Sequence, residues 1–248
     1  MPIFDPLIPM TPAMKRILLL SLPLFLLAVP LCAQVADPES YLSDIVAELG
    51  KRWPESRTLN LVFHGHSVPA GYARTPAVNT LQAYPHQVLC GIKDRFPTAV
   101  VNVITTAIGG EQSEQGAARF EAEVLTHRPD VLFIDYALND RTIGLERSEK
   151  AWRSMIEAAL ERGVKLILMT PTPDLSEDIR SDQARLYPYV QMIRSLAAEY
   201  HVGLADSYAC FRSRAETGEK MSSYMAQVNH PDARGHAIVA EEILRWFY

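Results

Sequence analysis

Short apolar runs alternate with amphipathic stretches along most of this chain. Five of the runs are compact and lack strict alternation of polar and apolar positions, which is typical of strands buried on both faces of a parallel sheet. They occupy residues 59–63, 100–104, 131–134, 166–169 and 202–205. Because a helical pattern separates each run from the next, the sequence predicts an α/β fold: a doubly wound, flavodoxin-like, five-stranded parallel sheet with helices on both faces.

The predicted helices are marked by apolar residues that recur every three or four positions. Three such stripes cover residues 81–96, 152–160 and 186–200. A closing helix is expected after Pro231, and an extra helix over about residues 36–51 precedes the first strand. Since no Gly/Ser-rich linker, repeat or change of composition follows residue 34, residues 34–248 are predicted to form a single domain.

Residues 1–33 have the pattern of a secretory signal peptide. A short basic segment at 14–16 precedes an apolar run at 17–29, and Ala33 is a small residue at the cleavage position. The run is too short for a comfortable membrane span. The mature protein is therefore predicted to be periplasmic or secreted, without stable membrane insertion. Two alternatives stay open: a lipoprotein signal acylated at Cys32, and an uncleaved membrane anchor.

Composition and charge exclude several classes of protein. With 248 residues, 48% of them hydrophobic and 21% charged, the chain is globular rather than disordered. The net charge of −5 argues against nucleic-acid binding, which needs clustered Lys and Arg. Three cysteines are too few for a disulfide scaffold and too scattered for a zinc knuckle. The sequence leaves open whether Cys90 and Cys210 pair in an oxidising compartment, and whether translation starts at Met1 or Met14.

Four candidate catalytic residues follow predicted strands or precede the last helix. Ser67 comes after the first strand in a turn flanked by glycines, which can present its hydroxyl to a substrate. Gly109 and Gly110 form a pair after the second strand, and a main-chain N–H at this pair can donate to an oxyanion. Asn139 follows the third strand and can donate its side-chain amide. His230 precedes the closing helix, and histidine is the natural base for a serine hydroxyl at neutral pH. Each of the four, taken alone, fits an ordinary turn, cap or structural role.

Together, in this order and on this fold, the four residues resemble the SGNH hydrolases, also called the GDSL family of esterases and lipases. The resemblance covers the chain from about residue 59 to the C-terminus. It implies that Ser67 is the nucleophile and His230 the base, and that Gly110, Asn139 and the N–H of Ser67 form an oxyanion hole. It also implies that neither a cofactor nor a metal takes part.

Three positions depart from the pattern of that family. His66 stands before the nucleophile, where the family has Asp, and Ala137 replaces a glycine two positions before the Asn. Gln227 replaces the acid that stands three residues before the catalytic His. A neutral amide cannot stabilise an imidazolium as a carboxylate does. The sequence therefore predicts a Ser-His dyad oriented by Gln227 or by a main-chain carbonyl, with Asp206 and Asp232 as candidates for a relocated acid.

The resemblance implies a serine esterase that forms an acyl-enzyme on Ser67 and hydrolyses short acyl esters, acetyl esters foremost. The predicted partner is a small-molecule or carbohydrate ester. Two alternatives stay open: a lysophospholipase or thioesterase with a long apolar groove, and a glycan-binding relative weakened by Gln227. His64 and His66 alternate along a strand as two metal ligands can, but no third ligand is identifiable, so no metal site is predicted.

Overall fold

The computed structural model describes residues 34–248, so the signal peptide predicted over residues 1–33 lies outside the described residues. Five parallel strands form one sheet in the order β2-β1-β3-β4-β5. Their bounds are Thr58–Gly65 (β1), Val100–Thr105 (β2), Val131–Asp135 (β3), Lys165–Met169 (β4) and Gly203–Ala205 (β5). The five strands predicted from the apolar runs are confirmed, each to within two residues at either end.

The strands are added to the sheet on one side of β1 and then on the other: β2 lies on one side, and β3, β4 and β5 follow on the opposite side. β1 lies between β2 and β3 and pairs in parallel with both of them. The connections that leave these strands therefore run to opposite sides of β1, which opens a crevice at the carboxyl ends of the strands. Ligands of open α/β sheets bind at such a crevice. The loops after β1, β2 and β3, which carry three of the candidate residues, meet at this end.

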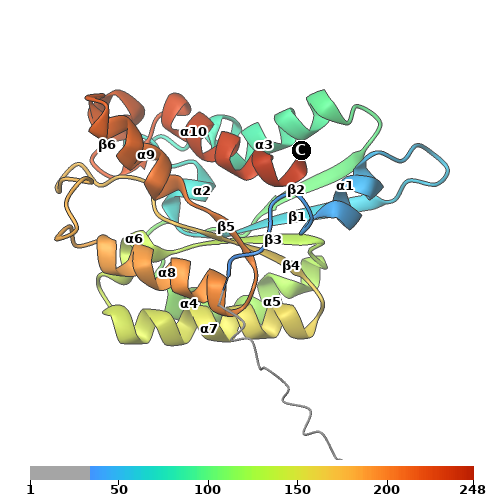
Figure 1. Ribbon diagram of the computed structural model, residues 1–248, viewed down its shortest axis with the longest axis horizontal. Coiled ribbons are helices and arrows are strands. Elements are labelled where there is room, and N and C mark those ends of the chain that lie inside the picture. The colour runs from blue at the N-terminus through green and yellow to red at the C-terminus, as the bar shows by residue number, and fades with distance from the viewer. Residues whose placement is uncertain (1–33) are drawn as a thin grey trace, which may run out of the picture. The chain divides into compact units, whose positions relative to one another are not determined.

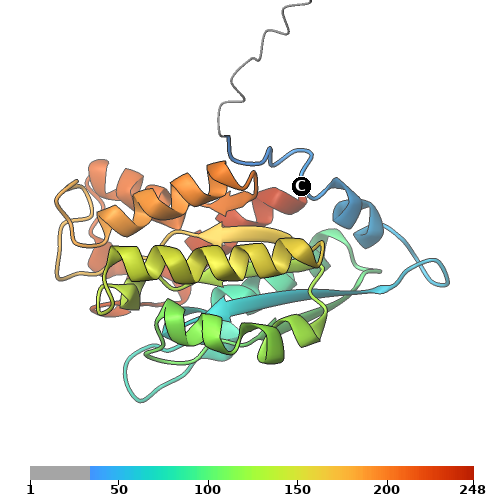
Figure 2. The same ribbon diagram turned by 90° about the horizontal axis from the view of Figure 1, so that it is seen from below.

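Helices cover both faces of the sheet (Figure 1). One face carries α1 (Ser43–Leu49), α3 (Tyr84–Arg95), α9 (Ser207–Glu216) and α10 (Ala233–Leu244). The other face carries α4 (Ser113–Ala118), α5 (Phe120–Glu123), α7 (Leu145–Glu161) and α8 (Tyr187–Glu199). Figure 2 shows this second face, where α7 lies between α8 and the short helices α4 and α5. Because successive strand residues point to opposite faces, Val62 belongs to one core and Phe63 to the other.

Short elements complete the structure, and the first helix and one pair of strands differ from the expectation. The helix expected over about residues 36–51 is limited to α1, because turns occupy residues 38–42. An antiparallel pair, β6 (Met225–Gln227) and β7 (His230–Pro231), precedes α10 and was not predicted, since strands this short leave no periodic pattern. The remaining elements are α2 (Ser67–Ala70), α6 (Ala137–Asp140), η1 (Thr80–Gln82), η2 (Leu125–His127), η3 (Met221–Tyr224) and η4 (Arg245–Phe247).

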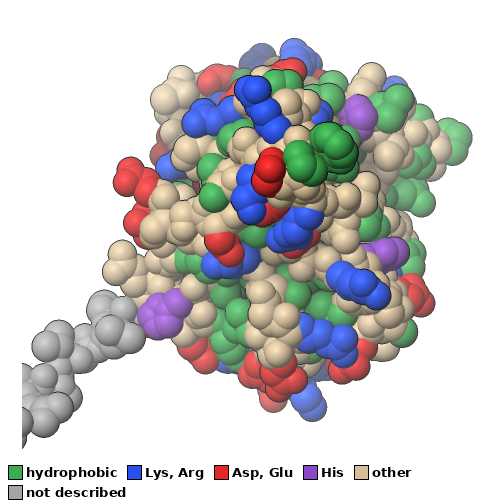
Figure 3. Space-filling model, turned by 90° about the vertical axis from the view of Figure 1, so that its right-hand side faces the viewer, with side chains coloured by type: hydrophobic (Ala, Val, Ile, Leu, Met, Phe, Trp, Pro, Cys, Tyr) green, Lys and Arg blue, Asp and Glu red, His purple; other side chains and the backbone are tan. Residues whose placement is uncertain are grey.

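The surface and the thiols add three observations. Acidic and basic side chains are interspersed on the edge of the molecule opposite the crevice (Figure 3). Among residues 34–248, no helix has both the length and the apolarity needed to cross a membrane. Cys90 and Cys210, whose pairing the sequence leaves open, are both free thiols.

Candidate active site

A sharp turn at the end of β1 places Ser67 at the crevice. β1 ends at Gly65, where a side chain would collide with the main-chain oxygen of Asp135 on β3. α2 begins with Ser67 and ends at Gly71, whose φ of 92° lies in the left-handed region that favours glycine. The two glycines let the chain leave the sheet and turn at once. The Ser67 hydroxyl is consequently held at the carboxyl ends of the strands.

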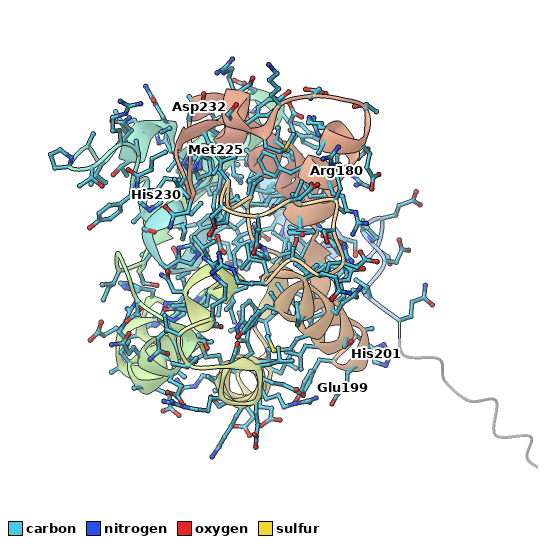
Figure 4. The ribbon with its side chains drawn as sticks, turned by 90° about the vertical axis from the view of Figure 1, so that its left-hand side faces the viewer. Arg180, Glu199, His201, Met225, His230 and Asp232 are labelled. Atoms are coloured by element: carbon cyan, nitrogen blue, oxygen red, sulfur yellow. The ribbon has the colours of Figure 1, made fainter. Side chains whose placement is uncertain are left out.

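The imidazole of His230 lies against the Ser67 hydroxyl. Nε2 of His230 is 3.0 Å from Oγ of Ser67, although 163 positions separate the two residues. His230 belongs to β7, which is held by its pairing with β6, and α10 follows directly. Figure 4 looks onto this edge of the molecule, where His230, Met225 and Asp232 lie near one another. The contact has the geometry of a nucleophile and its general base.

The other ring nitrogen of His230 meets two groups. Nδ1 is 3.0 Å from the main-chain oxygen of Ala73 and 2.8 Å from Nε2 of Gln227. The amide oxygen of Gln227 accepts hydrogen bonds from the N–H of Thr75 at 3.2 Å and from its hydroxyl at 3.4 Å. Gln227 therefore turns its NH2 group, a donor, toward the imidazole. A hydrogen on Nδ1 is donated to the carbonyl of Ala73, and the NH2 group of Gln227 then contacts Nδ1 without a hydrogen bond to it.

The two carboxylates considered for a relocated acid serve other roles. Asp232 accepts from the N–H groups of Arg234 and Gly235 at 2.9 and 3.0 Å, and so caps the N-terminus of α10. Asp206 caps α9 through the N–H of Ala209 and pairs with Arg194. Both side chains are thus engaged away from His230. The structure offers a main-chain carbonyl to Nδ1 instead of a carboxylate.

Gly110, in the loop after β2, and Asn139, on the short helix α6, lie on neighbouring segments. Gly110 has a φ of 79°, and in the described part of the chain a methyl group at its Cα would meet no atom within 4 Å, so this position opens onto free space. Nδ2 of Asn139 donates to the main-chain oxygen of Glu111 at 2.9 Å. The second hydrogen of that amide remains for another acceptor. The pair has the composition of an oxyanion hole.

A buried carboxylate behind Asn139 fixes the position of its loop. Asp140, which is fully buried, accepts from the N–H of Ser113 at 2.7 Å, the hydroxyl of Ser148 at 2.6 Å and the indole of Trp152 at 3.0 Å. These contacts tie α6 to α4 and α7. The sequence does not reveal this role of Asp140, since an acidic residue beside Asn139 carries no signal of its buried partners.

His64 and His66 do not approach a common ligand position. Nδ1 of His64 is 3.0 Å from the hydroxyl of Thr106, and its Nε2 is 3.0 Å from the hydroxyl of Tyr136. His66 instead faces Asp135. Burial lowers the pKa of His64 to about 4, with the charge of Arg119 acting in the same direction. Among residues 34–248, no group of three or more His, Cys, Asp or Glu side chains could hold a metal ion.

The electrostatics of His230 suit a general base. Burial lowers the pKa of its imidazole, and the hydrogen bond to the Ala73 carbonyl opposes this change. The ring is consequently neutral near pH 7 and can accept a proton. Acceptance by Nε2 requires the ring hydrogen on Nδ1, where the Ala73 carbonyl receives it.

Comparison with known proteins agrees with this geometry. Residues 63–238 match the model of the GDSL-like Lipase/Acylhydrolase family. The chain belongs to this family. As a GDSL-like hydrolase it is a serine carboxylic-ester hydrolase. The match includes the loops that carry Ser67, Gly110, Asn139 and His230.

Similar proteins include carbohydrate esterases. An acetylxylan esterase of Geobacillus stearothermophilus is 23% identical over 193 residues, which are 73% of this chain and 87% of that protein. The solved structure of a catalytic mutant of the acetylxylan esterase Axe2 from that organism has a TM-score of 0.66 and 22% identity, covering 76% of this chain and 94% of that one. A two-domain esterase active on acetylated mannans has a TM-score of 0.69 and 20% identity, covering 87% of this chain and 54% of that one. The structural likenesses show the shared fold.

Two departures of this GDSL-like hydrolase from the family pattern affect packing differently. Ala137 is fully buried at the start of α6, so its methyl group fits where the family has glycine. His66 is 1% exposed and accepts from the N–H of Val68, so it takes the N-cap position of α2. An imidazole can cap a helix only through an unprotonated nitrogen.

Proposed function

We propose that this chain is an exported esterase that removes acetyl groups from a carbohydrate through an acyl-enzyme on Ser67. The observation that carries the proposal is the 3.0 Å contact between Ser67 Oγ and His230 Nε2 at the switch point of the sheet. The carbohydrate is suggested by relatives named for acetylxylan and acetylated mannans. A small-molecule ester remains the alternative substrate.

In the first half-reaction, Nε2 of His230 takes the proton of the Ser67 hydroxyl while Oγ attacks the acyl carbon. The N–H groups of Ser67 and Gly110 and the free amide hydrogen of Asn139 face the oxyanion that develops. His230, now an imidazolium, returns the proton to the departing sugar oxygen. Its Nδ1–H is held by the Ala73 carbonyl throughout.

In the second half-reaction, water replaces the sugar hydroxyl. His230 takes a proton from the water as its oxygen attacks the acyl-enzyme, and the proton then passes to Ser67 Oγ as the acid product leaves. Both half-reactions thus use the same base and the same oxyanion donors.

Gln227 supports His230 indirectly in this proposal. Its amide oxygen holds Thr75, two positions after Ala73, and so keeps the Ala73 carbonyl beside the imidazole. Its NH2 group presents no negative charge to the imidazolium. We therefore expect turnover below that of an otherwise equal site with a carboxylate at this position.

The N-terminal segment and a second relative bear on location. The signal peptide predicted over residues 1–33 supports a periplasmic or secreted enzyme. An uncharacterised lipoprotein of Bacillus subtilis, YqeF, is 33% identical over 81 residues, which are 29% of this chain and 33% of that protein. Fractionation of cells that express the full chain or its Cys32→Ser variant distinguishes two possibilities. Cleavage after Ala33 leaves both proteins in the soluble fraction, whereas acylation at Cys32 holds only the wild type in the membrane fraction.

The experiment that tests the function compares wild type with Ser67→Ala on p-nitrophenyl esters and on acetylated xylan and mannan. The wild type should release acetate from the polysaccharides, and Ser67→Ala should lose activity on every substrate while its thermal unfolding stays close to that of the wild type. Turnover retained in Ser67→Ala would refute the nucleophile. Hydrolysis of p-nitrophenyl acetate without release from either polysaccharide would favour a small-molecule ester.

A further inference from the structure

A second histidine approaches Ser67 from the buried side. Nδ1 of His66 is 3.4 Å from Oγ of Ser67. The same nitrogen accepts a hydrogen bond from the main-chain N–H of Val68 at 3.3 Å. Only an unprotonated nitrogen can accept an N–H, so the ring hydrogen of neutral His66 lies on Nε2. The hydroxyl of Ser67 therefore has a ring nitrogen on each side, one from His230 and one from His66.

Nε2 of His66 faces a buried carboxylate. It lies 3.4 Å from Oδ1 of Asp135, within ion-pair distance but without hydrogen-bond geometry, and within residues 34–248 neither atom has a hydrogen-bonding partner. Asp135 ends β3 and is in register with Gly65 of β1, so the pairing of these strands brings the two side chains together. A ring hydrogen on Nε2 of His66 is therefore attracted electrostatically by the carboxylate of Asp135, in a buried region where such an attraction is strong.

The second oxygen of Asp135 is held by a buried tyrosine. The hydroxyl of Tyr84 donates to Oδ2 of Asp135 at 3.0 Å. Burial, together with the charge of Asp135, raises the pKa of Tyr84 well above its ordinary value, so the phenol keeps its proton and donates. The main-chain N–H of Tyr84 donates in turn to His236 on α10 at 3.2 Å. Oδ2 of Asp135 is therefore engaged on the side that faces away from His66.

We infer that Asp135 is a positioning residue for Ser67 and that it acts through His66. This inference rests on the proposed role of Ser67 as nucleophile. The carboxylate of Asp135 keeps the hydrogen of His66 on Nε2, which leaves the lone pair of Nδ1 for the N–H of Val68 and so fixes the turn that carries Ser67. In the other tautomer, Nδ1 would direct a hydrogen at the N–H of Val68. The first turn of α2, which carries Oγ and the N–H of Ser67, would then have to shift.

His66 and Asp135 each require the other. The family that this chain resembles has a carboxylate before the nucleophile, and a carboxylate can cap a helix without a choice of tautomer. An imidazole at this position caps α2 in one tautomer only and so needs a partner that selects it. Asp135, which is 4% exposed, is a buried charge that needs donors. In this chain the carboxylate therefore belongs to Asp135, which is one side chain further from the nucleophile than the carboxylate of the family pattern.

The experiment removes the carboxylate at position 135, introduces one at position 66, and then combines the two changes. Asp135→Asn keeps the shape of the side chain and removes the charge that selects the tautomer. We expect its kcat on p-nitrophenyl acetate to fall by roughly 10- to 100-fold, as when a reacting group is displaced by about 1 Å, with KM changed by less than about twofold. His66→Asp alone sets two buried carboxylates face to face, so it should lose more activity and also lower Tm.

The double variant with His66→Asp and Asp135→Asn should recover activity. Its new carboxylate can accept from the N–H of Val68 and from the new amide, whose oxygen can accept from the hydroxyl of Tyr84. The double variant then has one buried carboxylate at this contact, as the wild type has. We expect kcat to return to within about threefold of wild type, a strongly non-additive result for two residues in contact.

Tyr84→Phe is the matched control, because it removes the hydrogen bond on the oxygen of Asp135 that faces away from His66. It should lower Tm and leave kcat within about twofold of wild type. The inference is overturned if Asp135→Asn keeps wild-type kcat, if the double variant is no more active than His66→Asp, or if Tyr84→Phe loses as much kcat as Asp135→Asn. Should Asp135→Asn not fold, the comparison of His66→Asp with the double variant decides alone. Activity retained in Ser67→Ala would refute the proposed nucleophile separately.

Discussion

Replacing Gln227 with glutamate tests whether His230 lacks a carboxylate partner. The two side chains have the same length, so one carboxylate oxygen would take the place of Nε2, 2.8 Å from Nδ1 of His230. The other oxygen would take the place of the amide oxygen, which accepts from the N–H and the hydroxyl of Thr75. Gln227→Glu therefore adds one negative charge beside the imidazole and preserves the surrounding contacts.

The size of the effect follows from this distance. At a separation of 2.8 Å, two unit charges in an effective dielectric of about 20 interact by about 6 kcal/mol. Most of this energy is offset by the cost of holding a carboxylate in a half-buried site while His230 is neutral. If about a quarter of it remains, the transition state gains about 1.4 kcal/mol over the ground state, and kcat rises about tenfold.

The pH dependence has a definite sign. His230 acts as a base only when it is neutral, so activity is lost as the pH falls through its pKa, which burial holds below the ordinary value. The added carboxylate raises the pKa of His230, so the acid limb of kcat/KM moves to higher pH while the plateau rises. Hydrolysis of p-nitrophenyl acetate from about pH 5 to about pH 9 measures both changes. Gln227→Met, similar in length and uncharged, is the control. An unchanged plateau and an unmoved acid limb in Gln227→Glu would refute the reasoning.

Three further outcomes are expected. Asn139→Ala should lower kcat by about 10²- to 10³-fold with little change in KM, the loss expected for one oxyanion donor; steady-state kinetics measure this, and an effect confined to KM would mark Asn139 as a ground-state binding residue. Activity should fall steeply for acyl chains longer than about four carbons, as a panel of p-nitrophenyl esters measures; a preference for eight carbons or more would favour a lipase or thioesterase. Stability should fall in acid, because burial lowers the pKa of His64 to about 4 in the folded protein. The unfolded chain then binds a proton that the folded one does not as the pH falls from about 6.5 to about 4, which costs up to about 3 kcal/mol. Urea unfolding of wild type and His64→Gln at about pH 7 and about pH 5 measures this loss, and an equal pH dependence in both would contradict it.

Hydrophobic patterning determined the sheet and the region of the site. A strand covered on both faces must be apolar throughout, so runs such as residues 131–134 could be recognised without any long-range information. Parallel strands end at a common edge, so the polar residues after them could be grouped before their contacts were known. Ser67, Asn139 and the Gly109-Gly110 pair were grouped in this way and His230 by its place before the closing helix, but the choice of Gly110 and the roles of all four came from the resemblance to the SGNH hydrolases. The pair of β6 and β7 escaped notice because its strands are too short for a period to appear.

The contacts of the polar side chains were decided only by the tertiary structure. Asp206 and Asp232 were both candidates for a relocated acid, yet each caps a helix. The direction of the Gln227 amide depends on Thr75, 152 positions away, and the partner of His66 depends on the pairing of β1 with β3. A hydrogen bond is set by atomic distances and angles that arise only when distant segments pack together. Periodicity specifies which face of an element is buried, but it contains nothing about which buried donor meets which acceptor.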